Sequence, residues 1–265
     1  MDRIGIVVHT GREHVEEVAK HLAVRCAHRG IEAIVIHDER APASLEAIIA
    51  VGGDGTVLRA AAVALTIGVP VAGVNVGRVG YLAEFAVDEI DDLVDALAED
   101  RVHVVDRLTI EVRHRGRSAV AVNDVVVEKA VTQRIIQIAV TINGNRFARY
   151  RADGVIVATP VGSTAYSLSA GGPVVDPDVA ALVLTPVAPH SLLSRSLILS
   201  PSAVVGFDIE LDRSAQINVD GRGFAGVEPG EHVEVRRCDR PIGFVTLGRH
   251  PFPQAVRHQF GLDHA

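Results

Sequence analysis

Residues 45–67 read LEAIIAVGGDGTVLRAAAVALTI, and this stretch combines three local signals. Its first seven residues form a short apolar run, which predicts a buried strand. A loop with three glycines follows, and an alanine-rich segment of helix-forming composition then runs to Gly68. A strand, a glycine-rich loop and a helix in this order predict one unit of an α/β fold.

The sequence repeats this alternation over the first part of the chain. We expect further strands at residues 3–9, 31–37 and 69–75, and further helices at residues 12–29 and 87–100. Strands separated by helices of this length predict βαβ units on a parallel sheet. The first part of the chain is therefore expected to be a Rossmann-like α/β domain.

The pattern changes near residue 104 to repeated β-like runs, the last of them at residues 241–247. Asn143-Gly144 separates two of these runs and predicts a two-residue hairpin, because both residues tolerate positive φ. A short helix is expected near residues 163–170. We therefore predict an α/β domain over residues 1–102 and an antiparallel, β-sandwich-like domain over residues 103–265. About the last 20 residues are expected to pack back on the first domain.

Composition excludes several classes of function. The chain has 265 residues, of which 48% are hydrophobic, so it can bury a sizeable core. Its net charge of −7 gives no electrostatic reason to expect nucleic acid or membrane partners. No apolar run approaches the length of a membrane span, and the N-terminal residues do not resemble a signal peptide. We therefore expect a cytoplasmic protein.

The loop Gly52-Gly53-Asp54-Gly55-Thr56 is a candidate phosphate site. Its position before a helix would present free backbone N–H groups and the positive end of the helix dipole to an anion. The loop matches neither GxGxxG nor GxxxxGK[ST], and it contains no lysine. Phosphate charge must then be balanced by Mg²⁺ or by arginines, of which Arg59 lies about one helical turn beyond the loop.

Asp54 needs an explanation of its own, because a carboxylate beside phosphate is electrostatically unfavourable. An aspartate can accept a hydrogen bond from a substrate hydroxyl and take its proton as that oxygen attacks phosphorus. The alternative is that Asp54 only caps the following helix, since aspartate is a favoured N-cap residue.

The loop sequence GGDGT resembles a signature shared by NAD kinases, 6-phosphofructokinases and the diacylglycerol and sphingosine lipid kinases. Four further segments are similar to the NAD kinase family: NVGRVGYL at 75–82, ND at 123–124, DGVIVATPVGSTAYSLSAGGPVVDP at 153–177, and PVAPHSLLSR at 186–195. The resemblance covers essentially the whole chain, and the TPVGSTAYSLSAGGP block is highly specific.

The resemblance implies an NAD kinase, which transfers a phosphoryl group from ATP or polyphosphate to the adenosine 2′-hydroxyl of NAD and produces NADP. It further implies a divalent metal such as Mg²⁺, a homodimer or homotetramer, and Asp54 as the catalytic residue. The residues that would bind NAD and the phosphoryl donor are Gly52, Gly53, Gly55, Thr56, Arg59, Asn123, Asp124, Arg134, Arg151, Asp153, Thr164, Ala165, Tyr166, Ser167, Leu168, Ser169, Ala188 and Arg222.

Several of these residues also have ordinary structural interpretations. Asn123 and Asp124, two polar residues within an apolar run, are also typical of a bulge or a strand end. Tyr166 could be a core residue, and Arg134 could be a solvated surface arginine. Arg151 and Asp153, two residues apart, would lie on one face of a strand and could form an ion pair with each other.

Ser163 is expected to be the N-cap of the short helix that carries the family's dinucleotide-binding residues Thr164 to Ser169.

The chain departs from the family pattern at two positions. Asp124 stands where most members have glutamate, which shortens the reach of the carboxylate. Arg222 follows Asp220-Gly221 where the family usually has glutamine, so a cation replaces an amide and would add phosphate affinity or alter donor choice. Two rival functions stay open at this point, a lipid kinase and an NAD-binding sensor without turnover.

Overall fold

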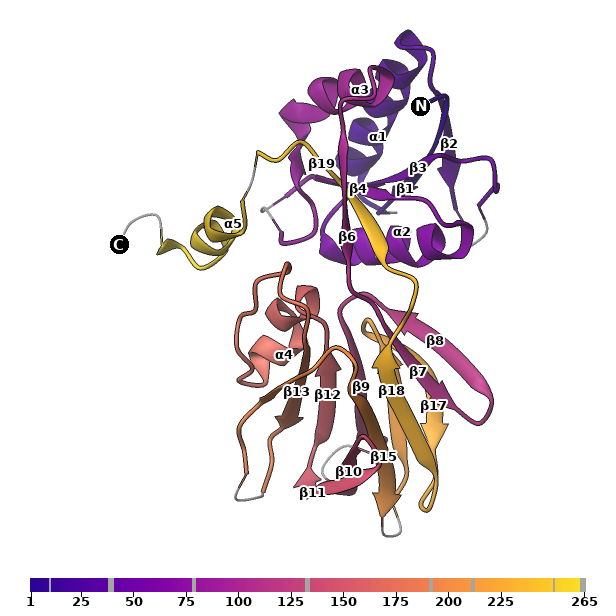
Figure 1. Ribbon diagram of the computed structural model, residues 1–265. Coiled ribbons are helices and arrows are strands. Elements are labelled where there is room, and N and C mark those ends of the chain that lie inside the picture. The colour runs from indigo at the N-terminus through magenta and orange to yellow at the C-terminus, as the bar shows by residue number, and fades with distance from the viewer. Residues whose placement is uncertain are drawn as a thin grey trace. The chain divides into compact units, whose positions relative to one another are not determined.

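The computed structural model describes residues 1–9, 11–37, 41–77, 80–131, 134–190, 193–210, 213–249 and 251–262. The chain divides into two compact units (Figure 1). The first unit comprises Met1–Arg107 and Ile242–Ala265, and the second comprises Leu108–Pro241. Each unit has its own hydrophobic core.

The first unit is built on a seven-stranded sheet of order β2-β1-β3-β4-β19-β6, with β5 paired to β4. Its strands are β1 (Arg3–Val8), β2 (Glu32–Ile36), β3 (Ala47–Val51), β4 (Val71–Asn75), β5 (Phe85–Ala86), β6 (His103–Arg107) and β19 (Ile242–Thr246). The pairs β1–β2, β1–β3 and β3–β4 are parallel, which confirms the expected parallel α/β sheet.

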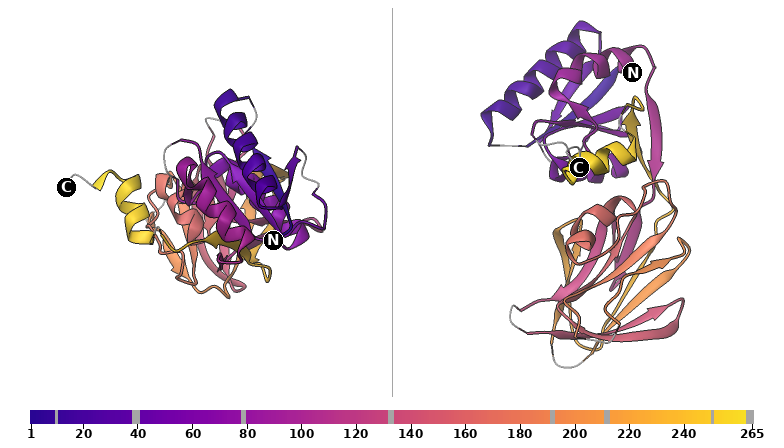
Figure 2. Two further views of the ribbon diagram at one scale, coloured as in Figure 1. Left: turned by 90° about the horizontal axis from the view of Figure 1, so that it is seen from above. Right: turned by 90° about the vertical axis from the view of Figure 1, so that its left-hand side faces the viewer.

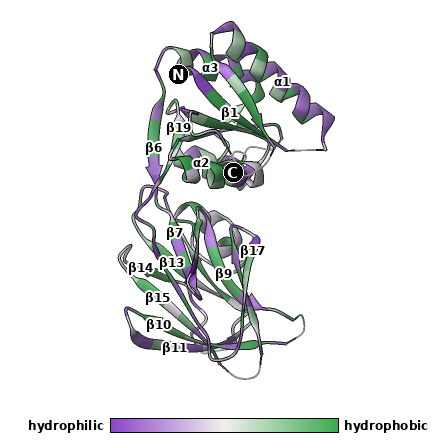
Figure 3. Ribbon diagram, turned by 90° about the vertical axis from the view of Figure 1, so that its right-hand side faces the viewer, coloured by the Kyte–Doolittle hydropathy of each residue, from purple (hydrophilic) through white to green (hydrophobic). Residues whose placement is uncertain are grey.

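Helices cover both faces of this sheet. The helices α1 (Glu13–His28) and α3 (Ile90–Ala98) pack on one face, and α2 (Asp54–Ile67) lies on the other (Figures 1 and 2). A 3₁₀ turn, η1 (Val87–Glu89), leads into α3. Hydrophobic and hydrophilic residues alternate along α1 (Figure 3), as expected for a helix with one face buried against a sheet.

The strands β6 and β19 belong to the first unit's sheet, whereas the sequence pattern groups both with the later β-like runs. β19 pairs in parallel with β4 at Phe244 and Val71, and it pairs antiparallel with β6. Alternating hydrophobicity identifies a strand but does not say which sheet the strand joins. The last helix, α5 (Phe252–Gln259), follows β19.

The second unit consists of two antiparallel sheets of six strands each, in the orders β11-β10-β15-β18-β7-β8 and β14-β13-β12-β9-β16-β17. Side chains from both sheets, such as Phe207 and Val235 from one and Val125 and Val157 from the other, form a single core. This arrangement confirms the predicted β-sandwich-like fold. The strands are β7 (Ile110–His114), β8 (Arg117–Ala121), β9 (Asp124–Lys129), β10 (Ile136–Ile142), β11 (Asn145–Ala152), β12 (Gly154–Ala158), β13 (Leu182–Val187), β14 (Leu197–Leu199), β15 (Val204–Glu210), β16 (Ala215–Val219), β17 (Arg222–Val227) and β18 (His232–Arg237).

The turns of the second unit follow the local sequence. Asn143 and Gly144 have φ values of 52° and 76° and join β10 to β11, which confirms the predicted hairpin. The predicted short helix is observed as η2 (Val161–Thr164) followed by α4 (Tyr166–Ser169). Beyond α4, Ala170 and Val175 pack against a cluster that includes Val126 and Ile156, on the face of the second sheet opposite the core.

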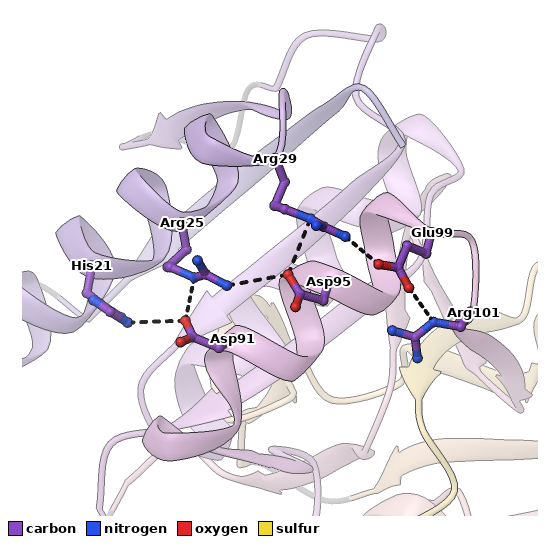
Figure 4. Close-up of polar contacts among 7 residues, drawn as sticks. All are labelled: His21, Arg25, Arg29, Asp91, Asp95, Glu99 and Arg101. Carbon is purple, nitrogen blue, oxygen red and sulfur yellow. Dashed lines mark hydrogen bonds and ion pairs between the residues drawn. The ribbon is translucent and has the colours of Figure 1, made fainter.

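Ion pairs connect α1 to α3 along their length (Figure 4). The guanidinium of Arg25 lies 2.6 Å from a carboxylate oxygen of Asp91 and 3.4 Å from one of Asp95. Arg29 lies 3.3 Å from the same oxygen of Asp95 and also pairs with Glu99. The Arg25 side chain is 26% exposed, so its charge is only partly screened by solvent.

Among the described residues, no helix is both long enough and apolar enough to cross a membrane.

We expect Arg25→Gln to lower the free energy of unfolding by about 0.5–1 kcal/mol, because partly exposed ion pairs contribute amounts of this order. The loss should shrink in about 1 M salt, where the Debye length falls to roughly 3 Å. Urea denaturation at low and high salt measures both values. As a control, Arg3→Gln removes a more exposed pair with Glu32 and should cost less. An equal loss at both salt concentrations would contradict an electrostatic origin.

Candidate functional site

The glycine loop joins the end of β3 to the start of α2. In an α/β sheet, ligands bind at this carboxyl end of parallel strands. Gly52 has a φ of 152°, and a Cβ added there would lie 2.4 Å from the hydroxyl oxygen of Thr56. Its N–H donates to the carbonyl of Val74 on the neighbouring strand at 2.9 Å. Only glycine fits this position, so the backbone and not a side chain shapes the loop.

The loop presents the first turn of α2. Gly53 is the N-cap residue and forms no side-chain cap. The first N–H groups of a helix have no partner within the helix, and the helix dipole adds partial positive charge at this end. The alternative in which Asp54 caps the helix is wrong, because Asp54 is the first helical residue and its carboxylate bonds elsewhere.

The carboxylate of Asp54 is held by the segment that follows β4. The N–H of Tyr81 donates to one carboxylate oxygen at 3.1 Å, and the N–H of Leu82 donates to the other at 3.2 Å. A Cβ at Gly80 would lie 2.1 Å from Asp54 Oδ1, so the close approach needs a glycine there. Burial, followed by the negative charge of Asp54, raises the pKa of the Tyr81 phenol. The carboxylate is thus fixed in direction.

Sequence reasoning missed this contact. The segment at 75–82 is similar to the family, but its sequence predicts no role for Gly80, Tyr81 or Leu82. Arg78 and Val79 of the same segment lie outside the described residues. A tertiary contact between residues 27 apart leaves no periodic signal in the sequence.

The side chain of Arg59, on α2, is held by a hydrogen bond to the backbone of β1. Its guanidinium donates a hydrogen bond to the carbonyl oxygen of Val8, the last residue of β1. The side chain therefore lies at the carboxyl end of the sheet, where the glycine loop also begins. The orientation of Arg59 toward a bound phosphate stays a prediction, and the structure shows its guanidinium in this contact with the backbone.

The donor set does not fit a resident Mg²⁺ site. Within the part of the chain that the structure describes, no three His, Cys, Asp or Glu side chains gather as metal ligands. Mg²⁺ at phosphoryl-transfer sites is commonly held by one or two carboxylates together with the phosphates of the substrate. A metal would have to arrive here with the phosphates.

In the second unit, Asn123 directly precedes β9, and Asp124 is the first residue of that strand. Both side chains are buried, with 8% and 4% exposure. The strand-end interpretation is therefore correct, but it leaves Asn123 Oδ1 buried and without a hydrogen-bond partner among the described residues. Because buried polar atoms are almost always satisfied, this oxygen is a candidate acceptor for a ligand donor.

The backbone around this pair is held by the turn after β12. The N–H of Thr159 donates to the carbonyl of Asn123 at 2.9 Å, and the Thr159 hydroxyl donates to the carbonyl of Val122 at 2.6 Å. A Cβ at Gly162 would lie 2.0 Å from the same carbonyl oxygen of Asn123. The pair is thus packed tightly against the segment that leads through η2 into α4.

Tyr166 lies near a group of acidic side chains. It is 40% exposed, so the interpretation as a core residue is wrong. Its pKa is raised by burial and then by the charges of Glu128, Asp153 and Asp124. Asp124 and Glu128 are four residues apart on β9 and therefore lie on the same face of the sheet.

Asp153 forms an ion pair with Lys129 at 2.7 Å, a partner that the sequence did not suggest. Arg151, the other residue of the expected pair, is exposed, and its carbonyl accepts a hydrogen bond from the N–H of His190 at 2.7 Å. Ala188, between β13 and that contact, has a φ of 44°. Such a conformation is costly for a residue with a side chain and is often found at binding sites.

The residues in and around α4 differ in how far their side chains are buried. The expectation that Ser163 is an N-cap is wrong, because its buried hydroxyl accepts the N–H of Val175 at 3.0 Å. Ser167 is fully buried and its hydroxyl bonds to that of Thr185 at 2.9 Å. The other candidates vary in exposure: Thr164, Ala165 and Leu168 are half-buried, and Ser169, Arg134 and Arg222 are exposed.

Asp124 is a buried carboxylic acid close to a second one, Asp220. Burial and then the neighbouring charge of Asp220 raise the pKa of Asp124 from 3.8 to about 7. Burial also raises the pKa of Asp220, although three backbone N–H groups and Arg222 favour its charged form.

We expect the protein to lose stability as pH rises from about 4 to about 7 through ionisation of Asp124. The folded state keeps a proton over this window that the unfolded state releases, so the free energy of unfolding falls. In the Asp124→Asn variant, the side chain at position 124 can no longer ionise. At pH 8 its free energy of unfolding should exceed that of the wild type by on the order of 1 kcal/mol or more. Denaturant titrations at pH 5 and pH 8 measure the difference. Exposed Asp239→Asn is the control and should show no such gain.

Two family models match the chain. The model of the ATP-NAD kinase N-terminal domain matches residues 32–102, and the model of the ATP-NAD kinase C-terminal domain matches residues 122–247. The NAD kinase of Mycolicibacterium paratuberculosis is 34% identical over 97% of this chain and 94% of its own length. The NAD kinase of Cutibacterium acnes is 35% identical over 97% of this chain and 89% of its own length.

Solved structures share the fold. The yeast NADH kinase complexed with NADH has a TM-score of 0.90 at 23% identity, covering 100% of this chain and 89% of that one. An NAD kinase from Archaeoglobus fulgidus in complex with ATP has a TM-score of 0.80 at 25% identity, covering 98% of this chain and 97% of that one. Since curated relatives match over nearly the whole length and both domain models match in order, the chain belongs to the NAD kinase family of enzymes.

Proposed function

We propose that this enzyme transfers the terminal phosphoryl group of ATP or polyphosphate to the 2′-hydroxyl of the adenosine ribose of NAD and produces NADP. The observation that supports this most directly is the fixed carboxylate of Asp54 beside the glycine loop. The Archaeoglobus fulgidus relative was solved in complex with ATP, which supports ATP as a donor.

Asp54 would act as the general base. Its two oxygens each accept one backbone N–H, and a carboxylate has about four lone-pair positions, so capacity is left for a substrate hydroxyl. As the hydroxyl oxygen attacks phosphorus, its proton would pass to Asp54 and the O–P bond to the leaving group would break. Because phosphoryl transfer depends mainly on positioning and charge stabilisation, no covalent nucleophile is required.

The donor phosphates would be held by the glycine loop and the N-terminus of α2 through backbone N–H groups. A Mg²⁺ ion would enter with the donor as part of the substrate, since the described residues build no metal cage. The chain would then hold the ion mainly through the phosphates that its own backbone N–H groups bind.

The second unit would hold NAD. The unpartnered Oδ1 of Asn123 suits a hydroxyl or amine donor of the adenosine, with Asp124 beside it. Half-exposed Tyr166 offers an aromatic face for stacking, and its neighbours Thr164 to Ser169, with Arg151, Asp153 and Ala188, would complete the pocket. Arg134 and Arg222 would supply further cations. A homodimer or homotetramer stays a prediction.

The central test incubates purified protein with NAD, ATP and Mg²⁺ and measures NADP. We expect NADP from the wild type and a loss of about 100-fold or more in kcat for Asp54→Asn, as for the removal of a general base. Polyphosphate in place of ATP compares the two donors.

A folded wild type that binds NAD without forming NADP would favour the sensor, and phosphorylation of diacylglycerol would favour the lipid kinase. Undiminished activity of Asp54→Asn would contradict the role of Asp54 as base.

We expect Gly80→Ala to lower kcat by about tenfold or more while the protein stays folded, because a Cβ there would displace the Asp54 carboxylate. Gly226→Ala is the matched control, since no atom lies within 4 Å of a Cβ at that glycine. Steady-state rates and thermal unfolding of both variants measure the effect. If Gly80→Ala and Gly226→Ala have equal kcat, the backbone contact with Asp54 is not important for turnover.

A further inference from the structure

Asp220 lies in the two-residue turn that joins β16 to β17. Asp220 and Gly221 have φ values of 47° and 74°, as in the Asp-Gly turns favoured by hairpins. The side chain leaves this turn and bonds to the start of β9 in the neighbouring part of the sheet. One oxygen accepts the N–H of Asn123 at 2.7 Å and of Asp124 at 3.1 Å, and the other accepts the N–H of Val122 at 2.9 Å.

We propose that Asp220 is a positioning residue for NAD, whose carboxylate fixes the backbone of Val122, Asn123 and Asp124 and so directs the two side chains that receive the adenosine. This inference rests on the proposed function, since it assumes that Asn123 and Asp124 bind the acceptor.

The backbone of the pair is held from both sides. The Asp220 carboxylate takes the three N–H groups, and the N–H of Asp220 donates to the carbonyl of Asp124 at 3.0 Å. From the other side, the N–H of Thr159 holds the carbonyl of Asn123. With both its N–H and its C=O group engaged, the backbone of Asn123 fixes the direction of the Cα–Cβ bond. The buried Oδ1 of the same side chain has no hydrogen-bond partner among the described residues and is open to a ligand.

Two carboxylates, Asp220 and Asp124, are buried close to each other, which is electrostatically unfavourable. This unfavourable placement argues against a purely structural role for Asp220. Burial opposes the charge of Asp220, and that charge in turn opposes ionisation of Asp124. A neutral turn residue would avoid the penalty, and local conflicts of this kind are typical of functional sites. Arg222 lies two residues beyond and its positive charge favours the Asp220 carboxylate, which gives a physical account of this departure from the family pattern.

Asp220→Asn tests the proposal. Asparagine tolerates the left-handed turn as well as aspartate does, but one acceptor oxygen becomes a donor, so at least one of the three N–H groups loses its partner. We expect the KM for NAD to rise by about tenfold or more, with kcat and the KM for ATP changing by less than about threefold. A KM for NAD within about twofold of the wild type would overturn the proposal.

The matched control is Asn143→Ala in the β10–β11 hairpin. Asn143 also has a left-handed φ, and its side chain accepts the N–H of Val204 at 2.9 Å. This variant should lose stability without changing the KM for NAD. If both variants raise the KM for NAD in proportion to their loss of thermal stability, Asp220 has only a structural role and the proposal is overturned.

A measurement on the wild type covers the case in which Asp220→Asn does not fold. Hydrogen exchange followed by NMR should find the N–H groups of Val122, Asn123 and Asp124 strongly protected, and exchange as fast as in an exposed turn would overturn the proposal. Failure of the proposed function has a different signature, since the wild type would then form no NADP whatever the exchange rates are.

Discussion

Hydrogen bonds from backbone N–H groups to a carboxylate organise the candidate sites of both units. Two N–H groups from the segment after β4 hold Asp54, and three from the start of β9 surround Asp220. Hydrogen bonds to a charged carboxylate are directional and stronger than those between neutral groups. They also allow a carboxylate to be placed where its desolvation would otherwise be unfavourable. Each unit therefore relies on loops whose conformation is determined by an acidic side chain.

Much of the fold could be predicted because its strands, helices and tight turns follow from short-range sequence patterns. The alternation of apolar runs and helical segments predicted β1, β3 and β4, and Asn143-Gly144 predicted its hairpin. Membership of β19 could not be predicted, since a strand's pattern is the same in either sheet. Asp220-Gly221 is an equally strong hairpin signal, but its importance lies in where the aspartate side chain reaches, and that depends on the pairing of β16 with β9.

In the candidate site, too, some residues could be recognised from local sequence and others only from long-range contacts. Gly52 of the loop could be recognised from sequence, because its local backbone geometry needs a glycine. Gly80 and Gly162 are needed for a different reason, which is the approach of Asp54 and of the Asn123 carbonyl from far along the chain. Ser163 looked like a helix cap from its position before the TAYSLS block, but a longer-range partner, the N–H of Val175, uses its hydroxyl instead.

The position of the second unit within the chain has a consequence for protein engineering. The chain leaves the first unit after β6 and returns at β19, and these two strands are antiparallel neighbours with Arg107 opposite Ile242. The β-sandwich is therefore an insertion into what would otherwise be a hairpin. A short turn in place of residues 108–241 would join β6 directly to β19 and leave the sheet of the α/β unit continuous, so the insertion can be removed or exchanged at one place in the sheet.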